Sequence, residues 1–305
     1  MDIVICDNNS DDNSVEIIYK SLEVDLIGIN AKRNKIGRLP YGIIRPRSDE
    51  PIEEFRFSRE APVIRIIQTG HNGGYAFGNN VGIKAALTNA DISYVWVLNN
   101  DTIVSVECAE KLISHMQRRP DAGLCGATVA YLEKPEIIQT AGGGGFSPLT
   151  GRCSLLGLGD PVSDPPDRHA IEGKLRYING ACVMVSRHFV QEVGFMTEDY
   201  FLYFEEFDWA KRARGRFSLI YTPDALVYHK VGASIGTSDD GNSSLLSIYY
   251  LNRSRMKFLC RFSKISIPFA IFDILKDSLV SLLRARPRDA YTRLIALAGL
   301  PYANI

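Results

Sequence analysis

The 305-residue sequence lacks several features that would identify a common class of protein. Lys plus Arg and Asp plus Glu both number 35, so no net charge points to a nucleic-acid partner. The six cysteines include no C-x-x-C pair, which argues against a zinc knuckle or a redox motif. We also expect no signal peptide, because Met1 leads straight into an acidic, strand-like segment. These absences predict a cytoplasmic globular protein with reduced thiols that binds no nucleic acid.

A membrane-spanning segment is not expected either. The apolar stretch 265–283 is interrupted by a proline and three charged residues. Helical spacing instead predicts an amphipathic helix within a tail that covers residues 261–305. Its apolar face comprises Ile271, Ile274 or Leu275, Leu279, Leu282 and Leu283, and its polar positions are Asp273, Lys276, Asp277, Ser281 and Arg284. Two alternatives stay open for the tail: packing against the main domain or a second subunit of a homo-oligomer, and peripheral contact with the inner face of the cell membrane.

Strand-like and helical segments alternate over residues 1–260. The apolar runs "VIRIIQT" (63–69), "YVWVL" (94–98) and "GLCGATVAYL" (123–132) are separated by segments with helical spacing. This alternation predicts an α/β domain with a mostly parallel sheet flanked by helices. Residues 22–62 interrupt the pattern and are interpreted as an irregular insertion, and the Gly- and Pro-rich residues 141–175 as a loop-rich lid.

Metal-capable and acidic side chains stand at the predicted ends of three elements. Asp101 follows the strand 94–98, His229 ends the last strand, and Glu205, Glu206 and Asp208 begin a helix. One carboxylate and one imidazole suit Mn²⁺ or Mg²⁺ when the cation also binds a diphosphate. An ionised carboxylate at a helix start could serve as a general base. Each residue also has a structural interpretation as a turn, cap or core residue.

Seven segments, in order, resemble motifs of the family 2 glycosyltransferases, and more closely those of the bacterial rhamnosyltransferase-like branch. The matching segments are "CDNNSDDNS" (6–14), "NGGYAFGNN" (72–80), "LNNDT" (98–102), "NGACVMVSR" (179–187), "VGFMTEDYFLYFEEFDW" (193–209), "VYHKVGASIG" (227–236) and "YYLNRSR" (249–255). The family has the GT-A fold, so the resemblance implies that fold for residues 1–260. It also implies an inverting, metal-dependent transfer of sugar.

The resemblance gives each site residue a role. Asp7 would contact the nucleotide base, and Asn72, Gly74, Asn79, Asn100 and Asp101 would belong to the nucleotide-sugar site. Asp101 would also bind Mn²⁺ or Mg²⁺, with His229 as second ligand. Glu206 would be the general base, with Glu205 and Asp208 beside it. The implied donor is a UDP- or dTDP-sugar, and the implied acceptor is a glycan or polyprenyl-linked acceptor of surface polysaccharide synthesis.

Two departures from the family pattern leave an alternative to the leading function open. The family sheet has an earlier strand, and this sequence begins at the second one, so the first strand is expected to be missing. Glu206 stands where the family has Asp, which moves the carboxylate by roughly 1.5 Å, the length of one C–C bond. The alternative is a truncated or inactive pseudoenzyme that binds a nucleotide or a partner.

Overall fold

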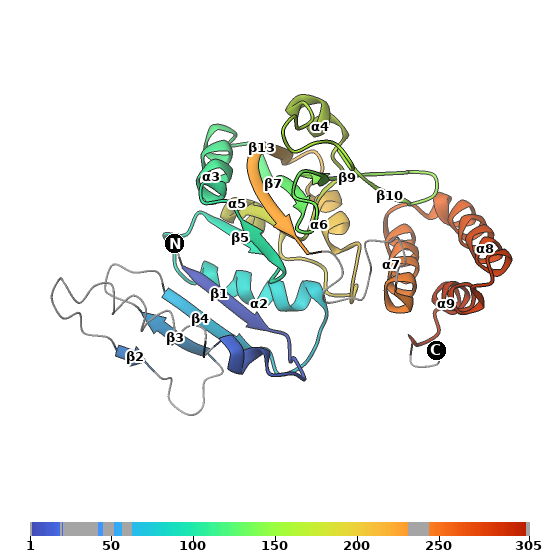
Figure 1. Cartoon of the computed structure of the whole chain (residues 1–305), viewed down its shortest axis with the longest axis horizontal. Coiled ribbons are helices and arrows are strands. Elements are labelled where there is room, and N and C mark those ends of the chain that lie inside the picture. Colours follow the sequence, from blue (N-terminus) through green and yellow to red (C-terminus); the bar gives the residue numbers. More distant parts are fainter. Residues whose placement is uncertain are drawn as a thin grey trace. The chain divides into compact units, whose positions relative to one another are not determined.

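The computed structural model describes residues 2–18, 20, 42–44, 52–56, 63–230 and 244–302 (Figure 1). The chain divides into two compact units, Met1–Asp91 and Ile92–Ile305. This boundary lies inside the predicted 1–260 domain, and the predicted tail belongs to the second unit. Each unit is described by itself below.

The first unit contains a four-stranded sheet in the order β1-β4-β3-β2. The strands are β1 (Ile3–Asp7), β4 (Val63–Gln68), β3 (Ile52–Arg56) and β2 (Gly42–Ile44). β1 and β4 are parallel, with Asp7 opposite Gln68, whereas the other two pairs are antiparallel. The parallel pair brings the carboxyl ends of β1 and β4 to one edge of the sheet, where ligands bind in α/β folds.

Helix α2 (Tyr75–Leu87) packs on β1 in this unit. The two elements are so close at Gly82 that a Cβ atom there would lie 3.1 Å from the Cys6 sulfur. Strands β2 and β3 fall inside the predicted irregular insertion 22–62, so part of that segment is sheet. The remainder of the insertion lies outside the described residues.

The second unit is built on a six-stranded sheet in the order β5-β12-β7-β13-β6, with β8 paired to β7. The strands are β5 (Tyr94–Leu98), β12 (Cys182–Ser186), β7 (Ala122–Tyr131), β13 (Ser218–His229), β6 (Thr102–Val104) and β8 (Ile138–Ala141). β7 and β13 are parallel and the other pairs are antiparallel. The predicted α/β class with helices flanking the sheet is confirmed, but pairing among the described strands is mixed instead of mostly parallel.

Helix α3 (Cys108–Arg118) covers one face of this sheet. Leu112 and Met116 pack with Cys125 and Val227 in a buried apolar cluster, and all four side chains are at most 2% exposed. Burial of this face fixes the register of β7 and β13, because a shift by one residue would turn their apolar side chains to solvent.

The segment 141–175 forms more regular structure than the loop-rich lid that we expected. It contains β9 (Gly143–Phe146), β10 (Cys153–Leu155) and α4 (Arg168–Lys174), and β9 lies between β10 and β11 (Tyr177–Ile178). A Cβ atom at Gly143 would lie 2.1 Å from the Tyr177 carbonyl oxygen. The glycines are therefore required for close contact between strands, and their number does not indicate a loop here.

Helices form the rest of the second unit. They are α5 (Arg187–Val193), α6 (Glu205–Ala213), α7 (Leu245–Phe262), the 3-10 turn η1 (Lys264–Ser266), α8 (Ile267–Leu283) and α9 (Pro287–Ala298). No helix in the described part of the chain is both long and apolar enough to cross a bilayer.

The predicted amphipathic helix of the tail is α8, but its faces are unusual. Ile274 is buried, whereas Leu275, Leu279, Leu282 and Leu283 are exposed. The predicted polar positions Asp273 and Ser281 are buried instead. The physical reason is a set of arginine partners from distant segments, described below.

Replacement of Gly143 by alanine should lower the free energy of unfolding by about 2 kcal/mol, because the new methyl group overlaps a backbone carbonyl that cannot move aside. Gly173→Ala is the matched control: it lies in α4, has nothing within 4 Å of its Cβ position, and should leave stability unchanged or slightly raised. Urea denaturation of both variants measures the difference. Equal stability would show that β9 tolerates a side chain.

Candidate active site

Asp101 and His229 meet at one end of the large sheet in the second unit. Asp101 follows β5 in a tight turn, in which Thr102 Oγ1 donates to the Asn99 carbonyl at 2.6 Å. His229 ends β13 and pairs with Thr102 across the ladder. The two side chains are thereby brought together, with His229 Nε2 3.2 Å from Asp101 Oδ1, and both are mostly buried.

A third residue, Gln139 on β8, determines which ring nitrogen of His229 carries the proton. Its side-chain oxygen Oε1 lies 2.9 Å from His229 Nδ1, so Nδ1 must carry the proton. In a neutral imidazole Nε2 then has a lone pair, directed at a carboxylate oxygen that also only accepts. Asp101 Oδ1 is buried and has no hydrogen bond within the described part of the chain.

Two acceptors held this closely favour a positive charge between or on them. A proton on His229 would satisfy the pair, and so would a divalent cation. The donor set is one carboxylate and one imidazole, which fits Mn²⁺ or Mg²⁺ bound also by phosphate oxygens. No group of three or more His, Cys, Asp or Glu side chains among the described residues could hold a metal ion alone. The residues therefore fit a cation that a bound diphosphate helps to hold.

The loop 179–181 connects this pair to the predicted general base. The Asn99 backbone N–H, two residues before Asp101, donates to the Ala181 carbonyl at 3.1 Å. The next residue back, Gly180, donates its backbone N–H to the carboxylate of Glu206 on α6. The structure thus brings Asp101, His229 and Glu206 together around one short loop.

The two adjacent glutamates of α6 lie in different environments. Glu205 is 1% exposed, and its Oε2 has no hydrogen-bond partner in the described residues. Burial, and then the charge of Glu206, raise the pKa of Glu205 well above its ordinary value. Glu206 is only partly buried. Burial raises the pKa of Glu206 to about 7, which suits a base that works near neutral pH.

The backbone before α6 is strained. Tyr203 and Phe204 have φ values of 65° and 75°, a region that side chains other than glycine rarely adopt. Phe204 is buried among aromatic rings, and the Tyr203 hydroxyl donates to Ser247 Oγ at 3.0 Å. These contacts hold the chain in the conformation that starts the helix at Glu205.

Asp208 was predicted as a third catalytic acid, and the structure instead makes it a structural residue. It is fully buried and accepts hydrogen bonds from Thr197 Oγ1 at 2.7 Å and Tyr200 at 3.1 Å. Arg212 and Arg261 form ion pairs with it at 2.7 and 3.0 Å. A carboxylate with four donors and no exposure is out of reach of a bound acceptor.

The predicted nucleotide-binding residues of the first unit also lie close together. Asp7 ends β1, and its Oδ1 accepts from the Ser10 backbone N–H at 3.1 Å. Asn8 connects the two loops at this edge, donating from Nδ2 to Asn72 Oδ1 at 3.1 Å and to the Gly74 carbonyl at 3.0 Å. Asn72 Oδ1 in turn accepts from the Gly74 backbone N–H at 3.1 Å. Sequence analysis gave Asn8 no role, although it stands next to Asp7.

Two further predicted nucleotide-binding residues have ordinary surroundings. Asn79 is on the second turn of α2, and its Nδ2 donates to the Tyr75 carbonyl of the same helix at 3.0 Å. Asn100 is exposed in the turn before Asp101. Their assignment to the nucleotide-sugar site stays a prediction.

A hollow lies near the glutamates in the second unit. It has a volume of about 460 Å³, and its lining includes the cationic residues Arg152, Lys174 and Arg176 together with Cys153. Phe146 also lines the hollow, and its ring lies 5.9 Å from that of Phe207 on α6. The hollow therefore lies beside the helix that carries Glu206.

Comparison with protein families gives one match. Residues 45–194, about half of the chain, match the model of glycosyl transferase family 2. With the sheets and helices described above, this match confirms the predicted α/β fold class of GT-A type.

One curated relative is the low-salt glycan biosynthesis hexosyltransferase Agl10 of Haloferax volcanii. It is 28% identical over 152 residues, which cover 50% of this chain and 46% of the relative. This chain therefore matches about half the length of that protein.

Two solved structures show weak similarity. The mannosyltransferase PcManGT of Pyrobaculum calidifontis, in complex with GDP-Man and Mn²⁺, has a TM-score of 0.46 at 12% identity and covers 98% of this chain and 65% of its own. TarS 1–349 of S. aureus has a TM-score of 0.42 at 12% identity and covers 99% and 83%. Similarity at this level does not identify an activity.

The structural role of Asp208 can be separated from catalysis. Asp208→Ala should lower the free energy of unfolding by about 3 kcal/mol, because it leaves the cations of Arg212 and Arg261 without their partner. Glu206→Gln, two residues away, should be at least as stable as the parent, since it removes an acid whose charged form is disfavoured by burial. Thermal unfolding measures both. An Asp208→Ala variant of parental stability without activity would restore the catalytic assignment.

Proposed function

We propose that this chain, whose residues 45–194 match the model of glycosyl transferase family 2, moves a sugar from a nucleotide-sugar donor to a hydroxyl of a glycan or lipid-linked acceptor. We further propose that the transfer is inverting and depends on Mn²⁺ or Mg²⁺. The name of the Haloferax relative, a hexosyltransferase of glycan biosynthesis, supports the reaction class.

The convergence of Asp101, His229 and Glu206 around the loop 179–181 is the observation that carries this proposal. The first two offer a site for a cation, and the third offers a base with a pKa of about 7. A divalent cation bound there with the diphosphate would neutralise the negative charge of the departing nucleoside diphosphate. Neither glutamate has to form a bond to the sugar.

The proposed role of Glu206 follows from one hydrogen bond and from the partial exposure of its side chain. The Gly180 N–H holds one end of the carboxylate, and partial exposure leaves it open to a hydroxyl group. Ionised Glu206 would accept the proton of the acceptor hydroxyl as that oxygen attacks the anomeric carbon from the face opposite the diphosphate. Glu205, buried behind it, cannot reach an acceptor without moving.

The cationic hollow supports an acceptor that carries phosphate. Lys174 and Arg176 line it, and it lies beside α6, the helix that carries the proposed base. A polyprenyl-linked glycan has phosphate groups close to its sugars, so we propose this acceptor class, with the reaction at the cytoplasmic face of the membrane in surface polysaccharide synthesis. UDP- and dTDP-sugars remain the predicted donors, and Asp7, Asn72 and Gly74 the predicted nucleotide ligands.

Asp101→Asn should lower donor hydrolysis and transfer by about 10²–10³-fold in the presence of Mn²⁺, because the amide cannot neutralise the cation. His229→Gln should raise the Mn²⁺ concentration needed for half-maximal activity. Asp164→Asn, an exposed carboxylate on the same unit, is the matched control and should behave as the parent. Direct Mn²⁺ titration in the presence of UDP gives a readout independent of turnover.

The proposal would be overturned if purified protein with Mn²⁺ or Mg²⁺ neither hydrolysed nor transferred sugar from a panel of UDP-, dTDP- and GDP-sugars. Nucleotide binding without turnover would then favour the inactive pseudoenzyme.

The pH dependence tests the assignment of Glu206. Its raised pKa of about 7 means that the carboxyl group is protonated, and unable to accept a proton, at lower pH. The rate kcat/KM should therefore rise with pH and level off above about 7. Glu206→Gln should lower the rate by about 10²–10⁴-fold and remove this rise. A rise that persists in Glu206→Gln and disappears in Glu205→Gln would move the base to Glu205.

A further inference from the structure

Helix α8 buries polar residues and exposes apolar ones, the reverse of a usual surface helix. An ordinary surface helix buries its apolar stripe and exposes its charges. In α8 the buried residues include Asp273, Ser278 and Ser281, whereas large apolar side chains point outward. The arrangement requires an explanation for both faces.

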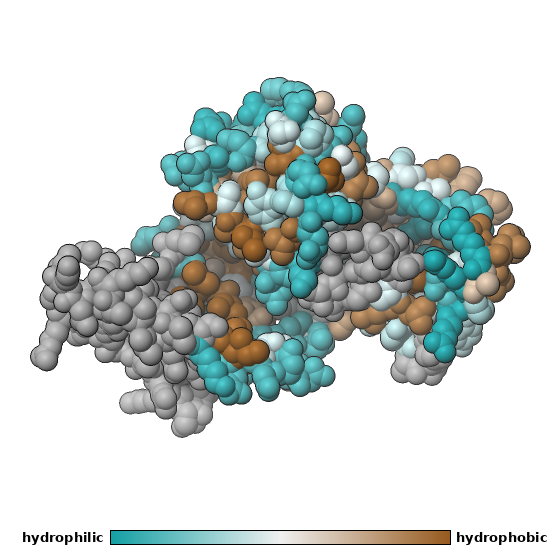
Figure 2. All heavy atoms as spheres, viewed as in Figure 1, coloured by the Kyte–Doolittle hydropathy of each residue, from teal (hydrophilic) through white to brown (hydrophobic). Residues whose placement is uncertain are grey.

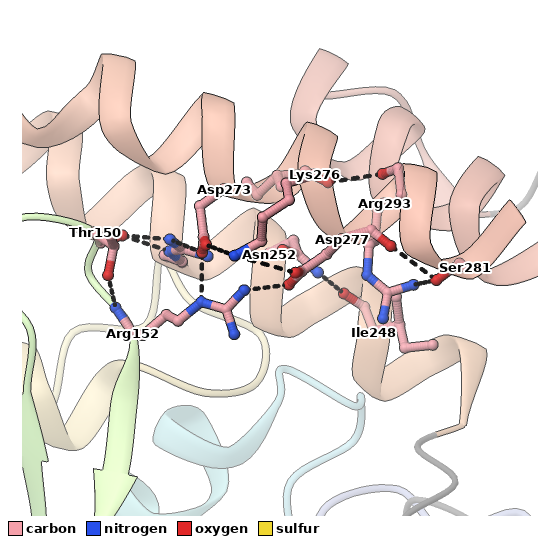
Figure 3. A network of polar contacts seen from close by, with 12 residues as sticks. Thr150, Arg152, Ile248, Asn252, Asp273, Lys276, Asp277, Ser281 and Arg293 are labelled. Atoms are coloured by element: carbon pink, nitrogen blue, oxygen red, sulfur yellow. Dashed lines mark hydrogen bonds and ion pairs between the residues drawn. The ribbon is translucent and has the colours of Figure 1, made fainter. Parts of the chain in front are cut away.

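The inward face is fixed by ion pairs to other parts of the second unit (Figure 3). Asp273 accepts hydrogen bonds from Arg152, from Arg255 at 2.8 Å and from Lys276 at 3.1 Å, and Arg152 also pairs with Asp277. Burial alone would raise the pKa of Asp273, but these donors hold it well below its usual range. Rotation of α8 to bury its leucines would break these bonds.

Because these ion pairs fix the orientation of α8, its apolar face points to solvent. Seven large apolar residues on η1 and α8 are between 47% and 83% exposed: Ile265, Phe269, Phe272, Leu275, Leu279, Leu282 and Leu283. The first six recur every three or four positions, and Leu283 adjoins the last of them, so all seven form one stripe along the helix, which we call the α8 stripe. Apolar residues gather over α8 at the right of Figure 2. A contiguous exposed patch of this kind marks an interaction surface.

Positive charge surrounds the α8 stripe. Residues 244–302 contain ten Lys and Arg but only three Asp and no Glu, although the whole chain is neutral. Lys264 is exposed before the helix, and Arg284, Arg286 and Arg288 are exposed after it. Asp273 and Asp277, two of the three acids, are already paired with Arg152. The surface around the stripe thus offers, at both ends, cations with no ion-pair partner among the described residues.

We propose that the α8 stripe docks on a membrane surface that contains anionic lipids. The phenylalanines and leucines would enter the boundary between headgroups and acyl chains, and the arginines at the helix end would contact lipid phosphates. The helix would lie in the plane of the interface, because it is not a spanning helix. This inference depends on α8 alone and stands or falls independently of the proposed transferase activity.

A second copy of the chain fits the same stripe less well. In a two-fold contact the stripe would meet itself. Parallel helices would place the three arginines against their own copies, and antiparallel helices would place them against Lys264. Both arrangements bring like charges together, whereas an anionic bilayer neutralises them.

The test is co-sedimentation of the full chain with phosphatidylcholine vesicles, with and without phosphatidylglycerol. The parent should sediment with the anionic vesicles, and less so as salt is raised. Phe272→Ser/Leu283→Ser should weaken binding at least tenfold, because both side chains are more than 70% exposed and contribute to the stripe. Arg284→Gln/Arg286→Gln/Arg288→Gln should remove the preference for phosphatidylglycerol.

Val106→Ser/Leu158→Ser is the matched control. It removes two exposed apolar side chains outside α8 and should bind vesicles as the parent does. Thermal unfolding should show all variants folded, since no changed residue is buried. Absence of parental binding, or equal binding by the α8 and control variants, would overturn the proposal. So would a parental dimer, measured by sedimentation velocity, that the α8 variant loses without any vesicle binding.

Discussion

The candidate active site depends on the contact between the Asp101 carboxylate and the His229 imidazole. His229 cannot turn away, because β13 lies between β7 and β6 and its ring is held by Gln139. Asp101 cannot retreat either, since its own backbone carbonyl accepts from the Lys230 N–H at 2.9 Å. The fold therefore keeps two groups with lone pairs 3.2 Å apart and mostly buried. Two lone-pair donors held this closely can bind one cation between them, and this geometry suits the site to metal-assisted chemistry.

Three acids at the start of α6 show how burial separates residues that look equivalent in sequence. Asp208 is fully buried and has four donors, so it belongs to the structural framework. Glu205 is as deeply buried without an equivalent partner, so its neutral form is favoured. Glu206 lies between these extremes, partly exposed and held by one backbone N–H. Only this intermediate environment suits a group that must gain and lose a proton.

The sequence was sufficient to name Asp101, His229 and Glu206 as candidates, because each stands at the end of a strongly patterned strand or at the start of a helix. The structure places the first two in contact, and their roles stay predictions. The sequence could not identify Gln139, which is an ordinary polar residue 90 positions from its partner. It was wrong about Asp208, since position on a helix does not reveal how many donors the rest of the chain brings. It was also wrong about the glycines of β9, whose role depends on a strand more than thirty residues away.

Helix α8 shows more clearly that a sequence pattern does not predict contacts with distant parts of the chain. Its periodicity correctly separated an apolar from a polar face, but periodicity cannot say which face the protein buries. That choice depends on Arg152 and Arg255, which come from β9–β10 and α7 and would be costly to leave without Asp273.

Arg152 also lines the hollow near Glu206. One guanidinium thus fixes the orientation of the α8 stripe and also lines the proposed acceptor site. The hollow and the α8 stripe lie within the same unit and share this residue. A lipid-linked acceptor could therefore bind the hollow through its phosphate while the α8 stripe contacts the membrane that contains its lipid chain.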